Sequence, residues 1–343
     1  MSQSALTPAD LRLLAAAGGA APSLHNSQPW RFRPTQDGGG VEVLADPDRS
    51  VPLADANGAA LHIAAGAALF NLRVAAARLG REGSVRLLPD PADPHLLAVL
   101  DLAGPAAAPL PPAPGPFGRD LYPAIAARRS SRRPFTNRDV PEAVAAELIA
   151  AARDEGVALA VLEEEGVRRV LEVTTEAEDR IAHDPARQVE TRSWLRPDGG
   201  EASDGLPYAV LGPQDHDARV PMREFAGRPP FHEGPPQPSQ RFEALPQLCT
   251  LLTTGDGPAD WLRTGQALER VWLLVTVHGL RLTVLHQAVE WPDLRWRLRD
   301  PAEGPGHVQL VLRVGYGPPG AATPRRPLED VLDLSAPPGP AGP

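Results

Sequence analysis

The sequence predicts an α+β protein that is internally duplicated, with two mixed sheets, two long central helices and a pseudo-two-fold relation within one chain. Residues 58–79 and 259–280 are long and apolar with helical spacing. Short strand-like runs alternate with helical segments along the whole chain. With 343 residues and 42% hydrophobic content, the chain can bury one large core or two ordinary ones.

The first part of the chain has clear helix boundaries. Thr7 is suited to cap the first helix, with Pro8 in its first turn and Gly18 at its end. Gly80 is a good stop for the long helix 58–79, whose apolar residues recur at helical spacing. Strands are expected at 31–33, 41–44 and 96–102.

A segment rich in Pro, Ala and Gly, residues 104–118, is expected to be a linker. It divides the chain into an N-terminal half, residues 1–110, and a C-terminal half, residues 111–343. Residues 184–245 of the second half have no regular period, and an ordered loop of this length is often a lid or insertion. Helices are expected at 121–133, 141–153, 167–183 and 259–280, and strands at 157–162 and 308–316.

The two long helices align with one another without gaps. Gly66 and Gly80 match Gly265 and Gly279 at a constant offset of 199 positions, and neighbouring Ala and Leu residues match as well. Such a repeat predicts a single-chain version of a two-fold dimer, with sites at the interface between the halves. Because Ala and Leu are common, two unrelated amphipathic helices are the alternative.

Composition argues against several classes of protein. All 34 basic residues are arginine, so the lysine required by a P-loop or a PLP enzyme is absent. A net charge of -9 argues against a nucleic-acid partner. With Cys249 as the single cysteine, no disulfide can form within the chain, and Asp215–His216–Asp217 lacks a second ligand group for a metal. Without a signal peptide or a run of eighteen apolar residues, we expect a cytoplasmic protein with no membrane partner.

Three short motifs carry the functional signal. They are Pro-Ser-Leu-His-Asn-Ser-Gln-Pro-Trp at 22–30, Arg-Arg-Ser-Ser-Arg at 128–132, and Gly-Tyr-Gly at 315–317 with Arg-Arg-Pro at 325–327. The first resembles the P-S-x-x-N-x-Q-P-W motif of the nitroreductase superfamily, the second its R-R-S-x-R motif, and the third its C-terminal end. Order and spacing are most similar to the Acg-like FMN-binding subgroup, whose members are pseudo-dimers in one chain. The resemblance covers most of the chain outside about 183–245.

This resemblance implies that FMN binds between the two halves. In the family, one subunit supplies the R-R-S-x-R segment and the C-terminal arginines, and the other supplies the P-S-x-x-N loop. Here the first half has only the loop and the second half only the arginines, with Glu-Gly-Val-Ala at 155–158 where a second loop would stand. One complete site can be assembled, which predicts one FMN per chain and a chain that functions as a monomer. Further oligomerisation is left open.

The family roles of the second half fall on residues with suitable chemistry. Arg128, Arg325 and Arg326 are phosphate candidates, because arginine binds phosphate bidentately and keeps its charge. Arg129 and Ser130 are assigned to the ribityl chain or the phosphate.

By its position in the motif, Arg132 is assigned to the N1/O2 edge of the flavin. Two-electron reduction places negative charge there, which a fixed cation stabilises. The alternative for the cluster 128–132 is a solvated basic helix end, which the helix dipole favours at a C-terminus.

The 22–30 loop is expected to cradle the ring and the ribityl chain with short polar groups, and its alternative is an ordinary helix-to-strand turn. His286 and Gln287 stand where the family places backbone N–H groups near flavin N5 and O4, although His286 fits equally a satisfied polar residue. Trp30 is expected in the core. The residues assigned here are Pro22, Ser23, Leu24, Asn26, His286 and Gln287.

These assignments predict an FMN-dependent oxidoreductase in which electrons pass through flavin N5 to a small acceptor. That step requires no protein acid or base, so no catalytic side chain is assigned. The family implies NAD(P)H as electron donor, although the sequence shows no Rossmann unit for it. The alternative function is an FMN-binding or FMN-sequestering stress protein, with residues 184–245 as a lid over the flavin and little reductase activity.

Overall fold

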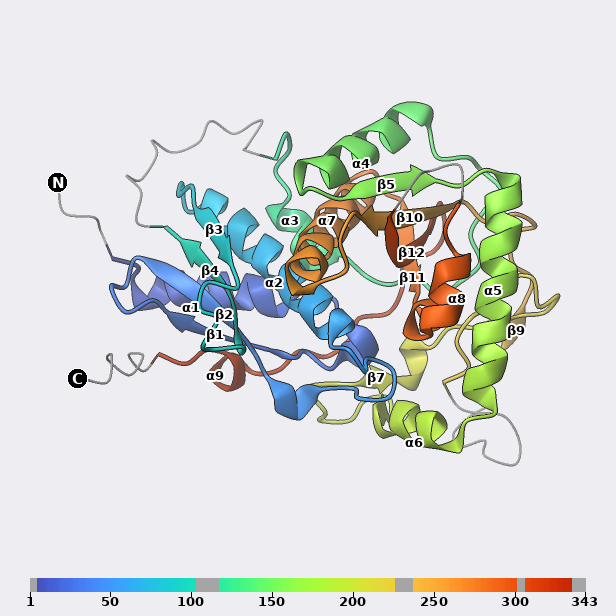
Figure 1. Ribbon diagram of the computed structural model, residues 1–343, viewed down its shortest axis with the longest axis horizontal. Coiled ribbons are helices and arrows are strands. Elements are labelled where there is room, and N and C mark those ends of the chain that lie inside the picture. The colour runs from blue at the N-terminus through green and yellow to red at the C-terminus, as the bar shows by residue number, and fades with distance from the viewer. Residues whose placement is uncertain (1–4, 103–116, 226–236, 301–305, 335–343) are drawn as a thin grey trace.

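The computed structural model describes residues 5–102, 117–225, 237–300 and 306–334. Within these ranges two four-stranded sheets lie apart from one another, with long helices between them (Figure 1). The predicted α+β class is therefore confirmed. Most of the predicted linker, residues 104–118, falls outside the described residues.

The first sheet belongs to the N-terminal part of the chain. Its strand order is β1-β2-β4-β3, and each neighbouring pair is antiparallel. Thr7 caps α1 as expected: its hydroxyl accepts a hydrogen bond from the Asp10 N–H, and the Asp10 carboxylate accepts one from the Thr7 N–H. The elements are α1 (Pro8–Gly19), η1 (Leu24–Asn26), β1 (Trp30–Pro34), β2 (Gly40–Ala45), η2 (Pro47–Arg49), α2 (Ala59–Arg78), β3 (Ser84–Leu87) and β4 (Leu96–Asp101).

The second sheet has the order β11-β12-β10-β5 and is also antiparallel throughout. Both halves run helix, two strands, long helix, two strands, and equivalent strands take equivalent places in the two sheets. The elements are α3 (Tyr122–Ala127), α4 (Glu142–Asp154), β5 (Ala158–Val161), α5 (Glu164–Ala182), β10 (Leu248–Thr253), α7 (Pro258–Val277), β11 (Arg281–Leu285), η4 (Gln287–Glu290), α8 (Pro292–Arg297), β12 (His307–Gly315) and α9 (Leu328–Val331).

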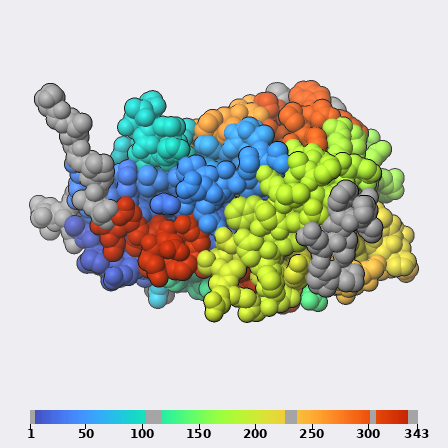
Figure 2. Space-filling view, turned by 90° about the horizontal axis from the view of Figure 1, so that it is seen from below, coloured from blue at the N-terminus to red at the C-terminus, as the bar shows by residue number. Residues whose placement is uncertain are grey.

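We call residues 184–225 the insertion, because they interrupt the second half in sequence and also lie against the first half. Figure 2 shows the yellow-green insertion beside blue atoms of the N-terminal part. Its own secondary structure is sparse, as the irregular sequence pattern predicted. The elements here and in the segment that returns to β10 are α6 (Pro185–Ser193), β6 (Leu195–Arg196), β7 (Leu206–Pro207), η3 (Tyr208–Val210), β8 (Gln214–Asp215) and β9 (Ser239–Gln240).

The two long helices cross at the glycines that the repeat had aligned. A Cβ on Gly66 would meet the Leu262 carbonyl and lie 3.1 Å from the Gly265 Cα, and a Cβ on Gly265 would meet the Ile63 carbonyl and lie 2.8 Å from the Gly66 Cα. Each contact is the counterpart of the other at the offset of 199 positions. The helices therefore touch backbone to backbone, which only glycine allows.

Helix α2 is long and apolar enough to cross a membrane by length and composition, and 78% of its most apolar window is buried inside the protein. Extensive burial of this kind is typical of the central helix of a core. The chain continues beyond β12 to the first half, where Leu332 forms a parallel bridge with Phe32 of β1. This return brings the C-terminal arginines to the 22–30 loop.

Three local predictions need correction. The helix expected at 121–133 ends at Ala127, because the next residues extend along β11, where the Ser131 N–H donates to the Leu282 carbonyl at 3.1 Å. The mixed character expected of the two large sheets is limited to single parallel bridges at their edges, such as Ser130 with Leu282. Strands β3 and β10 were not anticipated, since short apolar runs cannot be assigned by periodicity alone.

Candidate functional site

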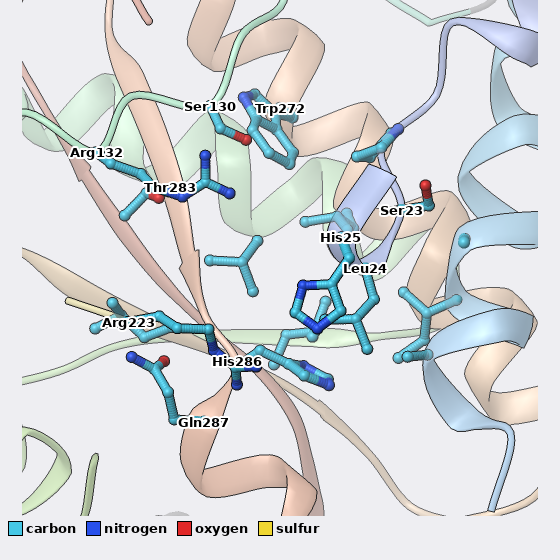
Figure 3. A pocket seen from close by; sticks show the side chains of 18 of the residues that line it. Ser23, Leu24, His25, Ser130, Arg132, Arg223, Trp272, Thr283, His286 and Gln287 are labelled. Atoms are coloured by element: carbon cyan, nitrogen blue, oxygen red, sulfur yellow. The ribbon is translucent and has the colours of Figure 1, made fainter. Parts of the chain in front are cut away.

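A large pocket lies between the two halves, beside the crossing of α2 and α7. Its empty volume, which includes the solvent at its open side, is about 880 Å³. Apolar side chains make most of its wall, and Figure 3 shows polar groups converging on it from several elements. Its wall includes Pro22, Ser23, Leu24, His25, Ala64, Ser130, Arg132, Met222, Arg223, Phe225, Leu268, Trp272, Thr283, His286 and Gln287. We call this space the apolar chamber.

A second hollow of about 440 Å³ adjoins the first and has a different character. The two share Pro22, Ser23, Ser130 and Arg132 in their walls. Four arginines line the second hollow, and no Asp or Glu is among the described residues of either wall. The arginines of this basic chamber are Arg128, Arg129, Arg132 and Arg325.

The 22–28 loop has an unusual backbone that its neighbours hold in place. His25, Asn26 and Gln28 all have positive φ, at 52°, 55° and 53°. For residues other than glycine this conformation is uncommon and is concentrated at functional sites. The Asn26 amide donates to the carbonyls of Gly205 and Pro324, both at 3.0 Å. The loop is thus fixed by the insertion on one side and by the C-terminal segment on the other.

Inside the loop, the Ser23 hydroxyl accepts a hydrogen bond from the Gln28 N–H at 2.9 Å. The Gln28 side chain donates to the Ser203 carbonyl at 2.9 Å and accepts from the Arg326 N–H at 2.9 Å. Gln28 therefore connects the motif to the insertion and to the C-terminal segment. Trp30 is fully buried, in the core position expected for it.

Arg128 stands at the inner wall of the basic chamber. Its Nε lies 3.3 Å from the Glu269 carboxylate, its guanidinium lies 4.7 Å from the Trp272 ring centre, and its Nη2 donates to the Ala20 carbonyl at 2.9 Å. Burial lowers the pKa of Arg128, and the nearby Glu269 carboxylate acts against this. The side chain thus connects the chamber to a buried charge on α7.

Arg132 contributes a cation to both chambers. Its Nη1 donates to the Val210 carbonyl at 2.9 Å, and its guanidinium lies 5.2 Å from the Phe225 ring centre. Burial, and then the charge of Arg223, lower the pKa of Arg132 to about 10. Within the described part of the chain it has no carboxylate partner. The pocket therefore holds a fixed positive charge that remains available to an anionic ligand group.

Arg325 and Arg129 complete the basic chamber. The Arg325 guanidinium donates to the Asn26 side-chain oxygen at 3.0 Å and to the Ala20 carbonyl at 3.1 Å. Burial, and then Arg128 and Arg129, lower the pKa of Arg325 to about 9. Three mutually repelling cations around one hollow indicate a site built for an anion.

The structure corrects the phosphate assignment of Arg326. This residue lines neither chamber, and its guanidinium instead pairs with the buried Asp46 at 3.1 Å and donates to the Gln28 carbonyl at 3.2 Å. Its contacts with Gln28 hold the motif loop in place. Of the two C-terminal arginines, Arg325 lines the basic chamber.

The segment after β11 closes the apolar chamber from the second half. The Gln287 amide donates to the Pro221 carbonyl at 3.0 Å and so connects this segment to the insertion. Burial, and then Arg223 and Arg295, lower the pKa of His286 to about 3, so its imidazole is neutral near pH 7. Both residues line the chamber with Thr283 and Leu285.

All twelve assigned residues except Arg326 therefore line one chamber or the other, and Ser23 and Arg132 line both. His25 also lines the apolar chamber; it lies inside the 22–30 motif, but no role was expected for it. Met222, Arg223 and Phe225 of the insertion line the chamber too, and no periodicity or motif marks them in the sequence.

Arg223 reaches the chamber from a buried ionic network. It pairs with Glu290, which also accepts from Arg187 at 2.8 Å. The Arg187 guanidinium lies 4.2 Å from the Trp291 ring centre. A buried carboxylate with two arginine partners is a rigid anchor, so the part of the insertion that covers the chamber is firmly held.

The insertion is attached to the first half at further points. The Glu190 carboxylate accepts hydrogen bonds from the N–H groups of Leu53 and Ala54 at 2.8 and 2.9 Å. Asp204 pairs with Arg49 of η2 and with Arg196. Together with the Asn26 and Gln28 contacts, these bonds hold the insertion over the pocket.

No protein-family model matches the chain. Among curated proteins, the chain is 31% identical over 325 residues to "Putative NAD(P)H nitroreductase Rv3131" of Mycobacterium tuberculosis, covering 91% of this chain and 88% of that protein. It is 28% identical over 325 residues to "Putative NAD(P)H nitroreductase acg" of the same organism, covering 92% and 93%.

Solved structures resemble the chain more distantly. One is a nitroreductase from Anabaena variabilis, with 10% identity, 92% of this chain and 90% of that chain covered, and a TM-score of 0.45. Another is the FMN and NADPH-dependent nitroreductase NfnB from a Sphingopyxis strain, with 20% identity, 63% and 98% covered, and a TM-score of 0.39.

Proposed function

The chain belongs to the NAD(P)H nitroreductase family of its mycobacterial relatives, and from this membership we propose that it is an FMN-dependent oxidoreductase. In this proposal NAD(P)H would be the electron donor, and a small molecule would be the electron acceptor. The flavin would supply hydride chemistry when bound. The residues of the two chambers would bind and orient it.

The observation that carries the proposal is a chamber lined by four arginines and no acid, directly joined to a larger apolar chamber. FMN has the matching shape and charge, with a phosphate at one end and a flat apolar ring at the other. Arg128, Arg129 and Arg325 would hold the phosphate through charge-assisted hydrogen bonds. Leu268 and Trp272 would pack against the ring. Ser23 lies at the junction of the chambers, and Asn26 lines the basic chamber.

Arg132 has a separate role in the proposal. Its guanidinium stands where the two chambers meet and has no carboxylate partner among the described residues. A preorganised cation in a low-dielectric pocket stabilises negative charge that appears on reduction. Arg132 would therefore favour the reduced state of the cofactor, with the Val210 carbonyl fixing its position.

We further infer that each chain binds one FMN and functions as a single-chain pseudo-dimer. Support comes from the matching strand orders and from the Gly66–Gly265 crossing. The position equivalent to Trp272 at the offset of 199 is Arg73, which pairs with Glu155 at 2.5 Å. Arg270 pairs with the same carboxylate at 2.8 Å, so this ionic network occupies the place equivalent to the chamber wall.

The test begins with an absorption spectrum of the purified protein and quantification of the released flavin. We expect about one FMN per chain and rapid bleaching by NADPH or NADH without oxygen. A colourless protein that takes up no added FMN would show that the chambers serve another ligand.

A second candidate function has its own support in the insertion. Contacts of Glu190, Asp204 and Gln287 hold it over the apolar chamber. If it does not open, pyridine nucleotides cannot stack on the flavin, and the protein would store FMN. Bleaching by dithionite but not by NADPH or NADH would favour storage over turnover.

A further inference from the structure

His25 is a buried polar side chain with an unused hydrogen-bonding atom. It is 4% exposed, and its Nε2 has no hydrogen-bond partner among the described residues. Buried polar atoms are nearly always paired, because leaving one unpaired sacrifices its interaction with water without replacement. An orphaned nitrogen in the wall of a cavity therefore indicates a ligand that supplies the partner.

The backbone at His25 also indicates a functional position. Its φ of 52° lies in the left-handed region, which is uncommon for a residue other than glycine. The hydrogen bonds of Asn26 and Gln28 to the insertion hold this conformation. The effect is to place a bulky imidazole in the chamber, where an extended backbone would not direct it.

The surroundings of His25 separate it from the phosphate end of the pocket. It lines the apolar chamber only, whereas the arginine cluster lines the basic one. Figure 3 shows its imidazole projecting into the pocket near His286 and away from Ser130 and Trp272. Its ring centre lies 6.1 Å from that of Phe225, which belongs to the insertion. The polar side chains at this end include His25, His286, Arg223 and Gln287, with no acid among the described residues of the wall.

The two hollows divide the pocket: the basic chamber suits the phosphate, which leaves the apolar chamber for the planar groups of the cofactor and an acceptor. A carbonyl or nitro compound gains negative charge on its oxygen when it accepts electrons. A neutral imidazole N–H near a cation can stabilise such an oxygen without being protonated itself.

We propose that His25 binds the electron acceptor, with its Nε2–H donating a hydrogen bond to a carbonyl or nitro oxygen. This role rests on the oxidoreductase function proposed above. For a quinone, the acceptor takes a hydride equivalent from the reduced flavin and one proton from water, and leaves as the hydroquinone. Reduced FMN, when bound, would be the source of the hydride equivalent, and His25 would keep its own proton throughout. Burial, and then the charge of Arg223, lowers the pKa of His25, which keeps the imidazole neutral.

The experiment follows reoxidation of the flavoprotein by stopped flow after reduction with dithionite, so that it does not depend on NAD(P)H. The oxidants are 1,4-benzoquinone, which offers an oxygen to His25, and ferricyanide, which accepts single electrons without that contact. The variants are His25→Asn, which tolerates a positive φ but lacks the reach of Nε2, and His25→Gln, whose amide N–H reaches further. His183→Asn, at an exposed histidine, is the matched control.

We expect His25→Asn to slow reoxidation by benzoquinone at least tenfold. The rate of reoxidation by ferricyanide should stay within twofold of the wild-type rate. His25→Gln should recover much of the loss, and His183→Asn should behave as wild type. An unchanged benzoquinone rate, or equal slowing with both oxidants, would overturn the proposal. Loss of flavin from His25→Asn would do so too, by assigning His25 to the cofactor. A wild-type protein that binds no FMN would instead overturn the proposed function, and the absorption spectrum tells the two failures apart.

Discussion

Gly66 of α2 and Gly265 of α7 meet at the crossing of the two long helices, where each lacks the Cβ that would strike the other's backbone. The sequence repeat pairs the same two residues. The pocket lies beside this crossing, and its wall includes Ala64 and Leu268 from the two helices. The close approach of the helices therefore determines the distance between the two walls of the proposed cofactor site.

Replacing Gly66 by Ala tests this crossing. The new methyl would meet the Leu262 carbonyl and force the helices apart, and overpacking of this kind costs about 1–3 kcal/mol. We expect a lower midpoint of urea unfolding and weaker flavin binding. Gly19→Ala is the control, because a Cβ there meets nothing within 4 Å. Equal stability of the two variants would show that the helices can separate without loss.

Arg128 combines a structural and a binding role, and these can be measured separately. Arg128→Ala leaves the Glu269 carboxylate buried without its partner, so we expect a loss of about 3–5 kcal/mol in unfolding free energy. The double variant Arg128→Met with Glu269→Gln removes both charges and should recover most of that stability. Its flavin affinity should stay low, because the phosphate contact of about 1.5–3 kcal/mol is gone. Wild-type flavin affinity in the double variant would exclude Arg128 from the phosphate site.

Arg132 should set the reduction potential of the bound flavin. We expect Arg132→Ala to lower the two-electron midpoint potential by roughly 30–60 mV, since about 30 mV corresponds to 1.4 kcal/mol. The reason is loss of the cation that stabilises the reduced form. Arg133→Ala is the matched control, because that side chain is exposed and lines neither chamber. Equal potentials in both variants would place the cation away from the flavin ring.

The lowered pKa of His286 predicts that the free energy of unfolding depends on pH. Its pKa is lowered to about 3 in the folded protein, from 6.5 when unperturbed. Between these values the unfolded chain binds a proton that the folded chain does not. The free energy of unfolding therefore has its full value above pH 6.5 and decreases as the pH falls towards 3. One such proton contributes a slope of about 1.4 kcal/mol per pH unit. His286→Gln should flatten the curve of unfolding free energy between pH 6 and 4, and an unchanged slope would refute an imidazole that stays neutral in the folded protein.

The contacts of the insertion should control access to the flavin. Glu190→Gln weakens the bonds to Leu53 and Ala54, and Asp204→Asn weakens the pair with Arg49. We expect the double variant to be reduced faster by NADPH in stopped flow and to release flavin faster. Glu176→Gln, at an exposed ion pair of α5, is the control. Identical reduction rates in all three proteins would mean that the insertion does not limit access.

Local sequence signals located much of the site. The 22–30 motif, the 128–132 motif and Arg325 could be assigned because they resemble motifs of the nitroreductase family, and the structure places them around two joined chambers. Gly66 and Gly265 could be aligned because a helix crossing constrains residue size at one position. These features depend on short stretches of chain, which a single sequence displays directly.

Other features depend on partners far away in the chain. The periodic pattern predicted that the helix at 121–133 extends past Ala127. In the structure the helix ends at Ala127, because Ser130 pairs with Leu282 of β11. Arg326 has the same side chain as Arg325, and only the position of Asp46 turns it away from the basic chamber. Met222, Arg223 and Phe225 lie in a stretch without a period, so no sequence signal marked them as part of the wall.

By itself, the sequence determined the α+β class, the two long helices, the loop motif and which segments carry arginines that can bind an anion. Each of these follows from short stretches of chain and from side-chain chemistry. The tertiary structure alone decided which arginines face the pocket, where the insertion lies and which polar atom of His25 is left without a partner. Those outcomes depend on burial and on hydrogen bonds between distant segments. Such contacts form only when the chain folds into its tertiary structure.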